Sequence, residues 1–126
     1  MSKRRILVVE DDCTLASQYR SALAFAGFDV DVASDGLSAL ENIDTDHPDL
    51  VVMELKMPQI GAEAVLSEAA ATPDTSHIPF IVLTGTESAI PGLRASVILQ
   101  KPCPPSDLVA KRSTLTGEHL AAYVGA

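Results

Sequence analysis

Four short apolar runs, each stopped abruptly by a polar residue, restrict the fold of this chain more than any other feature. They occupy residues 6–9, 50–53, 80–83 and 97–99. Unbroken apolar runs of this length are typical of strands that are buried on both faces. A further segment, residues 28–32, alternates apolar residues with Asp29 and Asp31. This alternation predicts a strand with one solvated face, near the edge of a sheet.

Segments with helical periodicity separate the predicted strands. Gly27 is the predicted stop of a first helix, whose apolar positions fall at helical spacing: Leu15, Tyr19, Ala22, Leu23 and Ala26. A second helix is expected after an N-cap at Ser34, and His47-Pro48 should break it. A third helix is expected over residues 62–71 and a last one from Ser106 onward.

This order of elements predicts an α/β fold. Because parallel strands are joined by right-handed helical crossovers, the strands should form one five-stranded parallel sheet between two layers of helices. The length of 126 residues and the 47% hydrophobic content suit a single domain over residues 1–126. The irregular stretch that contains Pro91-Gly92 predicts a fourth helix that is short or irregular.

The net charge and the N-terminal residues argue against a nucleic-acid partner and against a membrane segment. The net charge is −8 and the pI about 4.6, so nucleic acid is not an expected partner. Only four apolar residues separate the basic N-terminus from Glu10, too few for a signal peptide or a membrane span. Cys13 and Cys103 stand alone and are expected to be free thiols. We therefore expect a cytoplasmic protein without membrane contact.

Polar residues follow the apolar runs at the carboxyl ends of the predicted strands, where open parallel sheets bind ligands. These residues are Glu10, Asp11 and Asp12; Glu54; Thr84; and Lys101 with Pro102. Clustered carboxylates repel one another unless a cation is present, and their hard oxygen atoms suit Mg²⁺. A lysine and a hydroxyl can bind phosphoryl oxygen atoms. The sequence therefore predicts a site for a phosphoryl group, a divalent cation, or both.

These motifs, in this order, resemble the receiver domains of two-component response regulators. The resemblance covers about residues 5–115. It implies a flavodoxin-like, three-layer, doubly wound sheet with strand order 2-1-3-4-5. It also implies transfer of a phosphoryl group from a histidine kinase to an aspartate beside Mg²⁺, with a response at the face of the fourth and fifth helices and the fifth strand.

Single residues take family roles through this resemblance. Glu10 and Asp11 match the acidic pair, with Asp11 as the direct Mg²⁺ ligand, and Asp12 adds to the acidic pocket. Thr84 matches the switch hydroxyl and Lys101 the phosphate-pairing lysine, while Pro102 matches the turn that follows it. Alternatives stay open: Lys101 could instead form a salt bridge with Glu54 or Asp11, Thr84 could only cap a turn, and the site could hold no Mg²⁺.

Glu54 falls on the position of the phosphorylated aspartate and is the main departure from the family pattern. Its extra methylene moves the carboxylate out of line for attack, and a small misplacement of a nucleophile can cost on the order of 100-fold in rate. Three further departures concern switching: a shortened loop at residues 57–61, a shortened interval between Thr84 and Lys101, and Ile98 at the position of the aromatic switch residue.

The sequence therefore predicts an atypical receiver, or pseudo-receiver, that signals by protein–protein contact and is not phosphorylated at Glu54. Its expected partner is a histidine kinase or another signalling protein, and it is expected to be a monomer or weak homodimer. The alternative is a conventional phosphorelay receiver that accepts phosphate with Mg²⁺. An enzyme is not expected, because the chain has no glycine-rich phosphate loop and no nucleophile paired with a catalytic base.

Overall fold

The computed structural model describes residues 4–55, 60–84 and 97–100 of the 126-residue chain. Strands and helices alternate along these segments, as the apolar runs predict. The elements are β1 (Arg5–Val9), α1 (Cys13–Phe25), β2 (Asp29–Ala33), α2 (Gly36–Asp46), β3 (Leu50–Glu54), α3 (Ala62–Ala71), β4 (Phe80–Thr84) and β5 (Val97–Gln100). The regions expected to hold the fourth helix and the helix after Ser106 lie outside the described residues.

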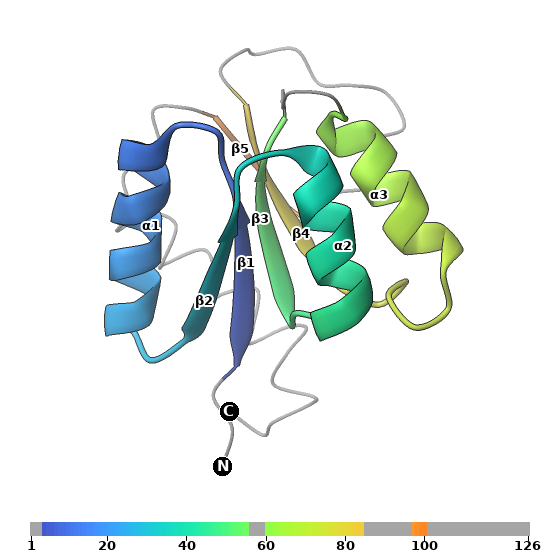
Figure 1. Ribbon diagram of the computed structural model, residues 1–126, viewed down its shortest axis with the longest axis horizontal. Helices are drawn as coiled ribbons and strands as arrows, with labels where there is room; N and C mark the ends of the chain where they lie inside the picture. The colour runs from blue at the N-terminus through green and yellow to red at the C-terminus, as the bar shows by residue number, and fades with distance from the viewer. Residues whose placement is uncertain (1–3, 56–59, 85–96, 101–126) are drawn as a thin grey trace.

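The five strands form a single sheet in the order β2-β1-β3-β4-β5. Every neighbouring pair is parallel. Figure 1 shows α1 on one face of this sheet and α2 with α3 on the other, which gives three layers. The predicted α/β class, the parallel sheet and the strand order 2-1-3-4-5 are confirmed.

The core is divided into two clusters because successive side chains of a strand point to opposite faces. Leu7 and Val51 face α2 and α3, where they join Ala39, Ile43 and Val65. Their strand neighbours Ile6 and Val52 face α1, where they join Tyr19 and Leu23. Each central strand therefore supplies both clusters, which explains its unbroken apolar sequence.

The edge strand β2 is more exposed to solvent than the central strands. It pairs only with β1, and its residues are mostly exposed or half-buried. The alternation with Asp29 and Asp31 predicts this position, and the structure confirms it.

Helix boundaries match the sequence signals except at one cap. The α1 helix ends at a C-cap on Ala26, and Gly27 follows with φ +105°, a conformation that glycine adopts without steric cost. The prediction of Ser34 as the N-cap of α2 was wrong by one residue. Asp35 is the cap, because its Oδ1 accepts a hydrogen bond from the backbone N–H of Ser38 at 2.8 Å.

Candidate functional site

The register of the two central strands brings two glutamates together at the carboxyl edge of the sheet. In the pairing of β1 with β3, Val9 lies opposite Met53. Glu10 and Glu54 are the next residues of the two segments, so they meet where the strands end. The structure thus places together acidic residues that are far apart along the sequence.

Glu10 is held firmly within this edge. Its side chain is only 3% exposed, and its backbone N–H donates to the carbonyl oxygen of Ala33 at 3.0 Å. Its Oε2 accepts a hydrogen bond from the backbone N–H of Asp12 at 3.2 Å. The backbone of β2 and the turn before α1 therefore fix the orientation of this carboxyl group.

Burial raises the pKa of Glu10 from 4.5 to about 7. The hydrogen bond from the backbone of Asp12 opposes this rise, whereas a side-chain hydrogen bond with Asp11 adds to it. The charge of Glu54 and a side-chain hydrogen bond with Glu54 raise the pKa further. Because its pKa is raised, Glu10 keeps its proton to a higher pH than an exposed glutamate does.

Asp11 and Asp12 differ in their surroundings although both are exposed. Asp12 is the N-cap of α1, and its Oδ1 accepts from the backbone N–H groups of Thr14 at 3.0 Å and Leu15 at 3.1 Å. One oxygen of Asp12 is thereby used by the helix. Asp11 contacts Glu10 and faces solvent, so it is the better placed of the two to bind a cation. The predicted metal role of Asp12 remains a prediction.

Glu54 is the last residue of β3 and is half-buried. The backbone directly after Glu54 is hydrogen-bonded to the neighbouring strand, because the N–H of Leu55 donates to the carbonyl oxygen of Leu83 at 2.7 Å. The carbonyl oxygen of Leu55 accepts in turn from the N–H of Ala62 at 3.2 Å, at the start of α3. Glu54 therefore extends from a fixed point of the backbone.

The other predicted site residues are described only in part. The backbone of Thr84 ends β4 in register with Gln100 of β5, which places position 84 at the same edge of the sheet. Lys101 and Pro102 lie outside the described residues, so their predicted roles are not tested.

Hard oxygen donors at this edge suit Mg²⁺, which is commonly held by one or two carboxylates and several water molecules. Among the described residues, no group of three or more His, Cys, Asp or Glu side chains is arranged to hold a metal. Binding of Mg²⁺ by water and one or two of the Glu10, Asp11 and Glu54 carboxylates stays a prediction.

The fold and this acidic edge define the class of protein. The sequence profile described as "Response regulator receiver domain" matches residues 6–112. The chain belongs to this family, which confirms the resemblance drawn from the motifs.

The curated relatives that match are named as response regulators. "Response regulator MprA" of Mycobacterium ulcerans (strain Agy99) is 36% identical over 116 residues, which cover 88% of this chain and 49% of that protein. The protein of the same name from Mycobacterium avium (strain 104) is 35% identical over 116 residues, covering 88% and 50%. The chain thus spans about half the length of the curated relatives it matches.

Solved structures share the fold. A response regulator receiver domain protein (CheY-like) from Methanospirillum hungatei JF-1 gives a TM-score of 0.87 at 25% identity, covering 96% of this chain and 99% of that one. The chemotaxis response regulator CheY4 of Vibrio cholerae gives 0.84 at 21% identity, covering 90% and 99%. In the part of the chain that is described, no helix is long and apolar enough to cross a membrane.

Proposed function

We propose that this receiver domain acts by contact with a signalling protein, such as a histidine kinase, and that Glu54 does not accept a phosphoryl group. Glu54 takes the place of the acceptor aspartate of the family. The domain is then a pseudo-receiver, whose output is binding rather than a phosphorylation switch and which carries out no enzymatic reaction.

The observation that carries the proposal is the pairing of Glu54 with Glu10. A nucleophilic carboxylate has to be ionised and aligned with the phosphorus atom. The Glu54 carboxyl group is instead directed at the buried Glu10, whose pKa it helps to raise. Its side chain is also longer than aspartate by one methylene, roughly 1.5 Å along the chain, from a backbone that Leu55 and Leu83 fix.

The proposal includes Mg²⁺ only as an ion that the acidic residues would bind. Asp11 would be its direct ligand, with Glu10 orienting the neighbouring water molecules. When bound, the ion would neutralise part of the carboxylate charge, as it does beside phosphoryl groups. Two backbone hydrogen bonds fix the acidic residues in place. The N–H of Asp12 donates to the Glu10 carboxyl group and so fixes the turn that contains Asp11, and the carbonyl oxygen of Ala33 accepts from the N–H of Glu10.

Beryllofluoride, a phosphoryl mimic, with Mg²⁺ gives a direct test. Backbone amide NMR spectra of the ¹⁵N-labelled chain would be recorded in Mg²⁺, with and without beryllofluoride, and acetyl phosphate treatment would be followed by intact-mass measurement. The matched variant Glu54→Asp restores the acceptor type of the family and differs by one methylene. We expect no adduct and no shift changes at the edge for the wild-type chain.

A response of Glu54→Asp alone would show that the rest of the pocket is competent and that glutamate silences it. A phosphoryl mass on the wild-type chain, lost in Glu54→Gln, would overturn the proposal. The chain would then be a conventional phosphorelay receiver with an unusual acceptor.

A further inference from the structure

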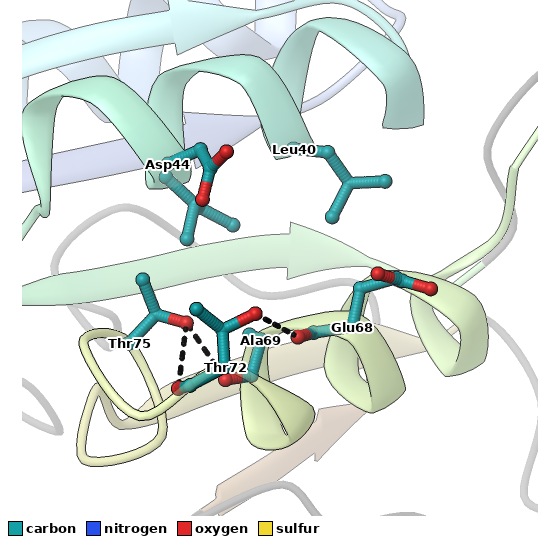
Figure 2. A pocket seen from close by; sticks show the side chains of 7 residues that line it. Leu40, Asp44, Glu68, Ala69, Thr72 and Thr75 are labelled. Carbon is teal, nitrogen blue, oxygen red and sulfur yellow. Dashed lines mark hydrogen bonds between the residues drawn. The ribbon is translucent and has the colours of Figure 1, made fainter.

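Helices α2 and α3 lie side by side on one face of the sheet and leave a groove between them (Figure 1). The groove has a volume of about 150 Å³. Figure 2 shows Leu40 and Asp44 on α2, Glu68 and Ala69 on α3, and Thr72 and Thr75 in the segment that follows α3. Ile43 completes the lining. This α2–α3 groove is separate from the acidic edge, and neither Glu10 nor Glu54 lines it.

The lining of the groove is amphipathic. Leu40, Ile43 and Ala69 supply an apolar floor that is buried or half-buried. Asp44 and Glu68 are exposed and place one carboxylate on each wall. A ligand that fits must therefore cover apolar surface and bring positive charge to the rim.

The threonine hydroxyls do not change this chemistry. Thr72 donates its hydroxyl to the carbonyl oxygen of Glu68 at 3.2 Å. Thr75 donates to the carbonyl oxygens of Ala69 at 2.7 Å and Thr72 at 3.3 Å. Because the backbone of α3 uses both donors, the carboxylates dominate the polar character of the groove.

Helices α2 and α3 carry no lysine or arginine, although the Arg5 guanidinium donates to the carbonyl oxygen of Asp46 at the end of α2, at 3.3 Å. The chain has no lysine or arginine from residue 21 to residue 55, or from residue 60 to residue 84, and these ranges contain all of α2 and α3. The nearby exposed side chains include further acids, Glu41 and Asp46 on α2 and Glu63 on α3. The charged side chains of α2 and α3 are therefore all acidic, and they attract cationic groups from outside.

We propose that the α2–α3 groove binds a lysine or arginine side chain from a basic segment of a partner protein. The aliphatic stem of such a side chain lies on apolar surface while its charged head reaches polar groups, which matches the floor and rim of the groove. The inference rests on the proposed contact function and names one contact surface.

A protein side chain fits better than a bare metal ion. Two carboxylates on opposite walls leave a cation short of ligands, and no metal-holding group of three His, Cys, Asp or Glu side chains exists among the described residues. A metal ion also has no use for the apolar floor. An isolated acidic patch would attract any cation, whereas this groove adds shape and apolar contact.

The probe is a hexa-arginine peptide with blocked ends, titrated into the full ¹⁵N-labelled chain in about 0.15 M salt, which screens diffuse attraction. We expect amide shifts that concentrate on α2 and α3 around Leu40, Asp44 and Glu68. The double variant Asp44→Asn/Glu68→Gln should weaken binding about tenfold, since each lost charge contact at a rim is worth up to roughly a factor of five.

The matched control is Glu41→Gln/Glu63→Gln. It removes the same charge from the same two helices but outside the groove, and it should change the dissociation constant by less than about twofold. Equal weakening by both double variants would overturn the proposal, because binding would then follow net charge alone. Equal or tighter binding of Mg²⁺ or spermine at the same amides would also overturn it, as would self-association through the groove in analytical ultracentrifugation.

The failure of this inference can be distinguished from failure of the proposed function. Peptide binding is read at α2 and α3, whereas phosphorylation is read at Glu54. A chain that takes phosphate and still binds the peptide through Asp44 and Glu68 would lose only the pseudo-receiver assignment.

Discussion

The backbone carbonyl oxygen of Ile60 occupies the space that a Cβ atom of residue 36 would need, and residue 36 is a glycine. A Cβ at position 36 would collide with that oxygen and would stand 2.8 Å from the Cβ of Ile60. Gly36 is the first residue of α2, and Ile60 precedes α3. The lack of a side chain at position 36 therefore lets the start of α2 pack against the segment that leads into α3.

The first prediction is that Gly36→Ala lowers the free energy of unfolding by about 2–3 kcal/mol, because the backbone has to move to make room. Urea unfolding followed by circular dichroism measures this. Gly61→Ala is the control: a Cβ there would meet the Leu55 carbonyl oxygen at an ordinary 3.6 Å. Equal losses in both variants would show that the close approach to Ile60 is unimportant.

The second prediction concerns pH and the Glu10–Glu54 pair. The pKa of Glu10 rises from 4.5 to about 7 on folding, so the folded state holds a proton that the unfolded chain releases. This contribution to stability is complete below pH 4.5 and is lost as the pH rises through about 7. Since one pKa unit corresponds to about 1.4 kcal/mol, the loss is on the order of 3–4 kcal/mol.

Unfolding free energies measured between about pH 4.5 and 8, with and without Glu10→Gln, test this prediction. The neutral amide can still accept the hydrogen bond from Asp12, but it does not titrate in this range. The wild-type chain should lose stability relative to the variant as the pH rises. Parallel curves for the two proteins would contradict the raised pKa.

Much of the site could be predicted from local sequence, because each polar residue directly follows an apolar run. The ends of parallel strands share one edge, so the sequence alone predicts that Glu10, Glu54 and position 84 lie together. The pairing of the Glu10 and Glu54 side chains could not be predicted in this way, because it depends on register and burial. The cap of α2 was missed because Ser34 and Asp35 are both good capping residues, and only backbone geometry selects between them.

The α2–α3 groove could not be predicted at all. Asp44 and Glu68 are exposed acids on separate helices, and along the sequence each resembles an ordinary solvated side chain. Their relation arises only when both helices pack on the same face of the sheet.

The third prediction separates two roles for Asp12. Its Oδ1 caps α1 through Thr14 and Leu15, so Asp12→Ala should lower the free energy of unfolding by about 1 kcal/mol. Asp12→Asn keeps the accepting oxygen and should lose much less. Chemical denaturation measures both, and repeating it with Mg²⁺ tests the metal role. Loss of Mg²⁺ stabilisation in Asp12→Asn, with an intact cap, would show that Asp12 also contributes to metal binding.

The last prediction concerns the end of α3, which forms part of the groove wall. The Thr75 side chain is buried, 2% exposed, and its hydroxyl donates to the carbonyl oxygen of Ala69 at 2.7 Å. Thr75→Val keeps the shape but leaves that carbonyl without its donor, so it should lower the free energy of unfolding by about 1–2 kcal/mol. Thr45→Val is the control, because its hydroxyl bonds the carbonyl oxygen of Glu41 at the surface of α2. A loss at Thr45 as large as at Thr75 would show that burial does not set the cost.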